Sequence, residues 1–493
     1  MSEQILLQGK ILGIQEFLLS PTCTTSARVA NEECFLGRCV WVSLLCEVLP
    51  RALLAELKLA RILLGSAGGG QFLLVLPGEA RSASEEFLAR AGEEIAWLSN
   101  GTLRLVCGIT ENLGDWTVVR KRLNEDLLRQ RGTPLASLGA STNGPQAVSG
   151  DRGARDQFIQ ELGATVRDAE TVGWSPESPG RVLLNGGKHV WKLTPNLTID
   201  GITMARHGAP SDSGRHRASL GTLAHRAPGR KMWGILRGDV DNLGVRLRRV
   251  QSIEEHVQLS VLYKHFFAGE LEVLCSMPEF WRKVSILYSG GDDFAVCGSW
   301  DALIQLSREI QRLFHRFVEE NLKDFPGAEG KTITMALAVA SDQGSSPERV
   351  FEEAGRNLEF AKNADKDCIY LLGRILEWRQ LSDASELKDT VTRMVAESRS
   401  SRQILFDLGS FYGKLSSIGR WPSLNPGGAE IHVEKIWRFH RRFNRVLGGA
   451  RDRDTQKLRA HLISEIAARN AAQVKLRPAG QVALEWARLL TEV

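Results

Sequence analysis

Two groups of aspartates stand out because each lies at the end of a short apolar run. Asp292 and Asp293 follow two glycines in "SILYSGGDDFAV" (285–296), and Asp239 and Asp241 lie in "RGDVDNLG". The glycines can adopt the positive φ angles of a tight hairpin turn, which leaves the first two aspartates at the turn edge. Residues two apart on a strand share a face, so we expect Asp239 and Asp241 to point the same way.

Such a group of carboxylates is typical of a site for a hard divalent cation. Like charges held close together repel one another, and binding of magnesium or manganese by their oxygens relieves that repulsion. Two such ions can activate an attacking hydroxyl and stabilise a leaving pyrophosphate. Each motif alone also has an ordinary structural explanation, a solvated turn for the first and a strand ending in an Asx turn for the second. Together, with a suitable strand order between them, they predict metal-assisted phosphoryl chemistry.

The elements that must position these aspartates occur twice along the chain. Hydrophobic periodicity predicts a strand, a long helix, two strands joined by a glycine turn, a helix, a strand and a helix between residues 5 and 131. The same order returns between residues 233 and 364. It is the β-α-β-β-α-β order of a ferredoxin-like domain. The glycine turn of the first copy, "SAGGGQFLLVLP", looks like the acidic turn of the second copy with its acids removed.

We therefore predict an α+β protein with four parts. A region rich in Gly, Pro and Ser separates the two ferredoxin-like domains, and the last region has a helical pattern with few strands. The predicted parts are a first, degenerate domain at 1–136, a small β-rich insert ending in a flexible loop at 137–231, a second domain with the GGDD turn at 232–379, and a helical bundle at 380–493.

Composition is that of a chain long enough for several domains. It has 493 residues, of which 43% are hydrophobic, and its net charge of +5 permits an anionic partner without requiring one. No apolar run approaches the roughly 18–20 residues of a membrane span, and the first residues do not resemble a secretory leader. We expect a cytoplasmic protein with no membrane contact. The eight cysteines never occur as C-x-x-C, so we expect them to be reduced.

The two motifs resemble a known family. "GDVDNLG" followed by "YSGGDDFAV" is similar to the second palm domain of the large, polymerase/cyclase-like subunit of type III CRISPR-Cas effector complexes. "GKILGIQEFLLS" resembles the opening of the first palm in that family, and "SAGGGQFLLVLP" resembles its degenerate turn. The order of first palm, insert, second palm and helical domain also matches, so the resemblance covers almost the whole chain.

This resemblance implies a function in an RNA-guided complex. Binding of target RNA would switch on the conversion of ATP into cyclic oligoadenylate messengers by two-metal nucleotidyl transfer, with two ATP molecules meeting between the GGDEF-like palms. The implied partners are the other CRISPR effector subunits, including backbone and small helical subunits, together with guide RNA and target RNA. The implied metal is magnesium or manganese. No zinc is expected, because the family's zinc-binding cysteines have no counterpart in residues 137–230.

The resemblance also implies roles for individual residues. The catalytic metal ligands would be Asp239, Asp292 and Asp293, with the Val240 carbonyl group assisting. The nucleotide-binding residues would be Asn242, Leu243 and Gly244 near the phosphates, Ser289, Gly290 and Gly291 along the nucleotide, and Lys362 and Lys366 at the triphosphate. For the two lysines, a solvated helix face is an equal alternative.

Two departures from the family pattern narrow these expectations. The first palm has Gly9, Lys10, Gly70 and Gln71 in place of the acids, so we expect it to bind no metal and to hold a nucleotide around residues 66–69. Many family members carry an N-terminal HD nuclease domain, whereas this sequence starts at the first palm and none of its ten histidines precedes an aspartate. We therefore expect no DNase activity from this chain.

Other functions remain open at this point. A catalytically silent scaffold and RNA-sensing subunit of the same kind of complex is one alternative. A stand-alone diguanylate-type cyclase is disfavoured, because those enzymes use one palm per chain and a different motif after the first aspartate. The basic stretch "KIWRFHRRFNRVLGGARDRD" (435–454) is compatible with RNA binding, a core helix with a solvated face, or a protein interface.

Overall fold

The first palm is built on a four-stranded antiparallel sheet. The computed structural model describes residues 4–20, 28–132, 152–397 without 197, 199 and 215, and 473–492, with short pieces between 405 and 470. The elements of the first palm are β1 (Gln4–Leu12), α1 (Ile14–Leu19), α2 (Arg28–Glu56), β2 (Leu64–Gly68), β3 (Gln71–Pro77), α3 (Arg81–Leu98), β4 (Arg104–Glu111) and α4 (Trp116–Gly132). The strand order is β2-β3-β1-β4.

The second palm repeats this plan and extends it at one edge. Its elements are β9 (Trp233–Val240), α7 (Leu243–Arg249), α8 (Ile253–Lys264), α9 (Leu271–Cys275), β10 (Val284–Ser289), β11 (Asp293–Ser299), α10 (Trp300–Asn321), β12 (Ile333–Val339), α11 (Pro347–Ala364), β13 (Cys368–Leu371) and β14 (Arg374–Glu377). The strand order β10-β11-β9-β12-β13-β14 begins with the order of the first palm. The predicted α+β class with two ferredoxin-like palms is confirmed.

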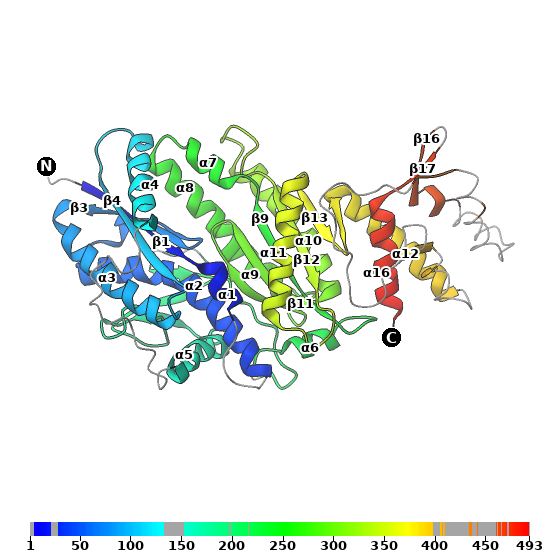
Figure 1. The fold of residues 1–493 in the computed structure, drawn as a ribbon, viewed down its shortest axis with the longest axis horizontal. Helices are drawn as coiled ribbons and strands as arrows, with labels where there is room; N and C mark the ends of the chain where they lie inside the picture. Colours follow the sequence, from blue (N-terminus) through cyan, green and yellow to red (C-terminus); the bar gives the residue numbers. More distant parts are fainter. Residues whose placement is uncertain are drawn as a thin grey trace.

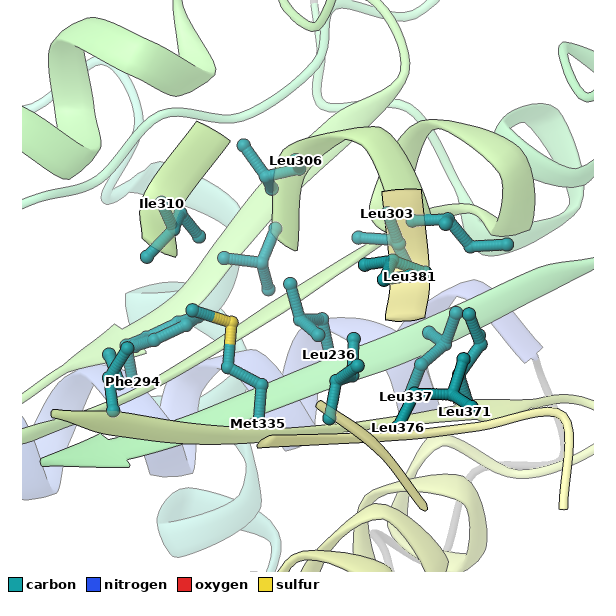
Figure 2. Packing of buried hydrophobic residues seen from close by; sticks show 14 of the residues in the cluster. Leu236, Phe294, Leu303, Leu306, Ile310, Met335, Leu337, Leu371, Leu376 and Leu381 are labelled. Atoms are coloured by element: carbon teal, nitrogen blue, oxygen red, sulfur yellow. The ribbon is translucent and has the colours of Figure 1, made fainter. Parts of the chain in front are cut away.

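Burial of both sheet faces explains why the strands of the second palm are so apolar. Every residue of β12 is buried, and α10 covers one face with a stripe of buried side chains at helical spacing. Figure 2 shows this contact, with Leu303, Leu306 and Ile310 of α10 over Leu236, Phe294 and Met335 of the sheet. The strand ends that carry the aspartates therefore start from a rigid, fully packed core.

The two palms pack against each other with approximate two-fold symmetry. Helix α2 of the first palm contacts β10 of the second, and α8 of the second palm contacts β2 of the first. Figure 1 shows the first palm in blue beside the second palm in green and yellow, with the C-terminal helices beyond it. Reciprocal contacts of this kind place equivalent parts of both copies at one interface. The two glycine turns meet there.

A buried ion pair joins the two palms behind these turns. Lys264 Nζ of α8 lies 2.5 Å from Glu47 Oε1 of α2, and Arg51 Nη1 lies 2.8 Å from Glu47 Oε2. The side chains of Glu47 and Lys264 are only 7% and 16% exposed. Burial lowers the pKa of Lys264, and the Glu47 carboxylate opposes this shift. Glu47 is thus the shared counter-ion of two buried cations from different palms.

The insert is β-rich, but its last loop is held in place rather than free. It contains α5 (Arg152–Thr165), a small sheet in the order β6-β5-β7-β8, and α6 (Leu220–His225); the strands are β5 (Thr171–Trp174), β6 (Leu183–Leu184), β7 (His189–Thr194) and β8 (Gly201–Thr203). Gly208 forms a β-bridge with Ser285, and Arg217 Nη2 donates to the Ile286 carbonyl oxygen over 2.9 Å. The expected flexible loop is therefore wrong, because the loop forms an added edge along β10.

The described C-terminal part is helical with one small sheet. Helices α12 (Trp378–Glu397) and α16 (Pro478–Thr491) pack together. A three-stranded sheet of β15 (Val433–Lys435), β16 (Ala467–Asn470) and β17 (Gln473–Leu476) was not predicted. Most of the basic stretch 435–454 lies outside the described residues.

Cys34 is disulfide-bonded, so the expectation of reduced cysteines is wrong for that residue. No helix among the described residues has the length and apolar character of a membrane span.

Removal of the Glu47 charge is expected to destabilise the protein more than removal of the Lys264 charge. Glu47→Gln leaves two buried cations without their counter-ion, which typically costs about 3–5 kcal/mol, whereas Lys264→Met leaves Glu47 paired with Arg51. Urea unfolding followed by tryptophan fluorescence measures both. Glu309→Gln is the control, because its pair with Arg312 is exposed and worth at most about 1 kcal/mol. Equal losses for Glu47→Gln and Glu309→Gln would contradict the interpretation.

Candidate functional site

The register of the second sheet brings the predicted catalytic aspartates together. Asp293 of β11 lies directly opposite Asp239 of β9 in the antiparallel pairing. The Val240 N–H donates to the Asp292 carbonyl oxygen over 3.0 Å, which ties the turn to the end of β9. Carboxylates that are far apart in sequence thus lie together at one end of two neighbouring interior strands. Their separation is set by backbone pairing and not by a flexible loop.

Glycines at the acidic turn serve close packing and not left-handed backbone, contrary to the sequence prediction. Neither Gly290 nor Gly291 has positive φ. A Cβ on Gly290 would lie 2.3 Å from Asp293 Oδ1, so a side chain there would displace the carboxylate. Positive φ angles occur instead in the first-palm turn, at 132° for Gly68, 59° for Gly69 and 75° for Gly70.

Asp239 is paired with a cation, and Asp293 accepts a hydrogen bond from a neutral hydroxyl group. Lys362 Nζ of α11 lies 2.6 Å from Asp239 Oδ2. Burial raises the pKa of Asp239 to about 6, and Lys362 limits that rise. The Tyr288 hydroxyl donates to Asp293 Oδ2 over 3.0 Å. Burial also raises the pKa of Asp293, although the nearby Arg237 guanidinium opposes the shift.

The site also opposes the negative charge of Asp292. Burial raises its pKa to about 7, and the neighbouring Asp293 and Asp239 carboxylates add to the shift by repulsion. Asp292 lines a cavity between the palms. A cation bound there would relieve the repulsion among the three carboxylates, so the position favours an added positive charge.

Asp241 does not join this group, which corrects the expectation that it points the same way as Asp239. Its carboxylate is 2% exposed and accepts hydrogen bonds from Thr332 Oγ1 at 2.8 Å, Thr334 Oγ1 at 2.7 Å and the Asp367 N–H at 3.0 Å. With both oxygens engaged, Asp241 fastens the end of β9 to the start of β12 and to the turn after α11. It therefore fixes α11, which carries Lys362.

The remaining predicted residues lie around the aspartates at different distances from the cavity. Ser289 and Gly290 line it, and the Ser289 hydroxyl donates to the Phe267 carbonyl oxygen. Asn242, in left-handed conformation with φ of 59°, accepts a hydrogen bond from Lys366 Nζ at 2.5 Å. Residues that do not line the cavity in this structure are Asn242, Leu243, Gly244, Gly291, Lys362 and Lys366.

The cavity lies between the two glycine turns. A Cβ atom added to Gly69 would be 3.6 Å from Gly291 N and 3.8 Å from Asp292 Oδ1, so the two turns lie close together. The cavity volume is about 230 Å³, below the ~300–1,000 Å³ common for ligand pockets. Its first-palm wall comes from α1, α2 and the glycine turn: Ile14, Gln15, Leu18, Cys39, Val42, Ser43, Leu44, Glu47, Gly68, Gly69 and Gly70.

The first palm has the same backbone register with different chemistry. Gly9 pairs with Phe72 as Gly238 pairs with Phe294, and a Cβ on either glycine would collide with the facing phenylalanine ring. The next pair is Lys10 with Gln71, at the positions of Asp239 and Asp293. Gly9 is therefore the counterpart of Gly238 and does not replace an acid.

The residues present suit a cation that is bound together with a substrate. Among the described residues, no three His, Cys, Asp or Glu side chains are arranged to hold a metal ion by themselves. Magnesium, however, is often bound by one or two carboxylates plus substrate phosphates and water. Asp239 and Asp292 at the cavity wall supply carboxylates of that kind. The donor set therefore fits a divalent ion that arrives with phosphate ligands.

Comparison with known proteins assigns the second palm. The family model for the Cas10/Cmr2 second palm domain matches residues 232–370, the segment that holds all three aspartates. Residues 232–370 therefore form a palm domain of the Cas10/Cmr2 type. The recognition made from the sequence motifs is thereby confirmed.

Curated Cas10 relatives are distant and longer. The "CRISPR system single-strand-specific deoxyribonuclease Cas10/Csm1 (subtype III-A)" of Mycobacterium tuberculosis is 23% identical over 401 residues, covering 63% of this chain and 48% of that protein. The protein of the same name from Methanocaldococcus jannaschii is 33% identical over 112 residues, covering 20% of this chain and 14% of that protein. The chain thus spans about half the length of the M. tuberculosis relative.

Solved Cas10/Csm1 structures share the fold of this chain. An apo Csm1–Csm4 cassette has a TM-score of 0.70 at 17% identity, covering 99% of this chain and 70% of that chain. Csm1 of T. onnurineus has a TM-score of 0.68 at 15% identity, covering 100% of this chain and 70% of that chain. A Csm1–Csm4 cassette in complex with one ATP has a TM-score of 0.64 at 15% identity, with coverage of 99% and 70%.

Sequence reasoning missed the polar residues that surround the aspartates. Arg237 and Tyr288 line the cavity, as do Glu47 and Lys264. Arg237 had a usable signal, because it lies two residues before Asp239 on the same strand and so shares its face. The Glu47–Lys264 pair had none, since it depends on how the two palms dock.

Asp292→Asn is expected to stabilise the metal-free protein in a pH-dependent way. The pKa of Asp292 is about 7 in the folded state, against an ordinary value of 3.8, so the folded chain keeps a proton that the unfolded chain has lost. The stability of the wild type therefore falls as the pH rises through this window. The benefit of the substitution should be smallest at pH 4, grow towards pH 7 and level off at up to about 4 kcal/mol.

Urea titrations of both proteins between pH 4 and pH 8, with chelator present, measure this difference. A constant difference over the whole pH range would contradict the buried, mutually repelling arrangement of the three aspartates.

Proposed function

We propose that this chain is the catalytic large subunit of a type III CRISPR effector complex and that it converts ATP into cyclic oligoadenylate when the complex binds target RNA. The observation that carries the proposal is the meeting of Asp239, Asp292 and Asp293 at a cavity between two palms. The match of this segment to the Cas10/Cmr2 second palm supports it. Solved Csm1–Csm4 cassettes of the same fold, described in complex with ATP and with cA4, support the substrate and product class.

The chain's own residues would bind and orient the nucleotide. Asp239 and Asp292 would hold magnesium or manganese together with substrate phosphates, with the Val240 carbonyl group and Asp293 completing the predicted ligands. When bound, such an ion supplies hydroxyl activation and charge neutralisation at the leaving pyrophosphate. Lys362, whose ammonium lies 2.6 Å from Asp239, is placed to donate to a phosphate oxygen at the same point. Lys366 and the Asn242–Gly244 backbone would contact the phosphates at a greater distance from the metal ligands.

Entry of two nucleotides requires the palms to separate at their turns. The cavity of about 230 Å³ lies below the usual range of ligand pockets, and the turns at Gly69 and Gly291 lie close together across it. The first palm would hold one nucleotide through its glycine turn at residues 66–69, where positive φ angles let the backbone approach a phosphate closely. A change in the palm–palm contact would then control activity.

The partners of the chain follow from the same proposal. Csm1 relatives of this fold are described in subcomplexes with Csm4, so we infer a Csm4-like backbone subunit for this chain. A small helical subunit, guide RNA and target RNA complete the expected complex. The curated relatives are named deoxyribonucleases, and the absence of DNase activity from this chain stays a prediction.

A catalytically silent scaffold of the same complex is the second candidate. It is favoured by the absence, among the described residues, of a ready three-ligand metal group and by the pairing of Asp239 with Lys362. Against it, the aspartates repel one another in a buried place, an arrangement that a retired site would be free to lose. The first palm shows a copy without these acids, because it has Lys10 and Gln71 at the positions of Asp239 and Asp293.

Substitution of both turn aspartates should abolish product formation without loss of assembly. The reconstituted complex is incubated with ATP, magnesium or manganese and matched target RNA, and products are resolved by liquid chromatography with mass spectrometry. Wild type is expected to form cyclic oligoadenylate, and Asp292→Ala/Asp293→Ala is expected to form at least ~100-fold less, as for loss of a group acting only in the transition state. Glu319→Ala/Glu320→Ala is the matched control, because it removes two adjacent exposed acids from α10 of the same palm.

Equal product from wild type and the Asp292→Ala/Asp293→Ala variant would place catalysis elsewhere. No product from wild type, in a complex that binds target RNA, would favour the scaffold.

A further inference from the structure

Asp293 is held from behind by two polar residues on neighbouring strands. The Tyr288 hydroxyl of β10 donates to Asp293 Oδ2 over 3.0 Å. Arg237 Nη2 of β9 lies 3.4 Å from the Tyr288 oxygen, so the guanidinium donates to the hydroxyl that donates to the carboxylate. All three residues line the cavity between the palms. They form a series of two hydrogen bonds that ends at one oxygen of the Asp293 carboxylate.

Arg237, the first residue of this hydrogen-bonded series, is itself fixed by α11. Its guanidinium carbon lies 4.2 Å from the centroid of the Phe351 ring, in the geometry of a cation–π contact. Gly355, one turn further along α11, makes room for it, since a Cβ there would lie 2.4 Å from Arg237 Nη1. A planar group stacked on a ring and packed against a glycine has little freedom to rotate. Arg237 can therefore hold Tyr288 in one orientation.

The first palm serves as an internal comparison for this pair. In the first sheet Gln8 lies opposite Leu73, and Ser66 also pairs with Leu73. In the second sheet Arg237 and Tyr288 have the same relation to Ala295. Both edge strands have their irregularity at the same place, just before Ser66 and just before Tyr288. The copy without acids thus has Gln8 and Ser66 where the copy with acids has arginine and tyrosine.

We propose that Tyr288 and Arg237 are positioning residues that hold Asp293 in the orientation in which its second carboxylate oxygen can bind a divalent ion. The inference rests on the proposed function, and it gives Arg237 and Tyr288 a role that the sequence analysis of the two motifs did not assign to them. Partners of metal-binding carboxylates restrict their rotation, so that less order has to be imposed when the ion binds. The Tyr288 hydroxyl occupies Oδ2, whereas Oδ1 lies against Gly290, which lines the cavity together with Asp293.

The test is manganese binding by the purified full-length chain, measured by electron paramagnetic resonance of free Mn²⁺ in the presence of a non-hydrolysable ATP analogue. Tyr288→Phe removes only the hydroxyl and is expected to weaken Mn²⁺ binding about 10–100-fold, the usual effect of losing such a partner. Arg237→Gln, which installs the first-palm residue, is expected to weaken it in the same direction. In the reconstituted complex with target RNA, both variants should form less product at low Mn²⁺ concentration. Product formation should return at high Mn²⁺ concentration, with little change in the KM for ATP.

Tyr263→Phe is the matched control. Tyr263 is 1% exposed in the same palm, and its hydroxyl donates to the Gly330 carbonyl oxygen over 2.7 Å. Both variants remove a hydroxyl group and its hydrogen bonds from the interior of the same palm, two for Tyr288 and one for Tyr263. A general loss of stability would therefore affect both variants, whereas only Tyr288→Phe should change Mn²⁺ affinity. Equal Mn²⁺ affinity in wild type and Tyr288→Phe would overturn the positioning role alone. No Mn²⁺ binding by wild type would overturn the proposed metal site and the positioning role with it.

Discussion

The pairing of Asp239 with Asp293 across two central strands is the constraint on which the rest of the site depends. Backbone hydrogen bonds fix these carboxylates side by side, and Asp292 follows at the adjoining turn. Burial and mutual repulsion then oppose their ionisation, as the raised pKa values of Asp239 and Asp292 record. Lys362, Tyr288 and Arg237 compensate two of the three aspartates, which leaves Asp292 as the carboxylate with most to gain from a bound cation.

The same register without the charges gives a different surface. In the first palm, Lys10 faces Gln71, and three consecutive glycines with positive φ make the turn between its strands. A turn without side chains can approach the acidic turn closely, since even an added Cβ on Gly69 would lie only 3.6 Å from Gly291 N. One copy therefore supplies the three carboxylates, and the other supplies the facing wall of the cavity. The Glu47–Lys264 ion pair holds these two surfaces together from behind.

Hydrophobic periodicity and turn chemistry are local properties that can be read from the sequence. They were enough to predict the repeat, the strand order around the acidic turn and the adjacency of Asp239 to Asp292 and Asp293. It failed where tertiary contacts decide. Asp241 was expected beside Asp239, but hydroxyl groups from the neighbouring strand β12 turn it away. The role of Gly290 was misread, since close contact with Asp293 and not its φ angle requires glycine. Loop residues near Gly208 were expected to be flexible, because their pairing with β10 has no signature in the sequence.

The measurement that tests the central claim most directly is the location of manganese in crystals of the chain grown with Mn²⁺ and a non-hydrolysable ATP analogue, by anomalous diffraction. The account predicts manganese at Asp239 and Asp292 of the second palm, in contact with nucleotide phosphates, and none at Lys10 and Gln71 of the first. Nucleotide bound between the palms with no manganese at these aspartates, or with manganese at both palms, would contradict it.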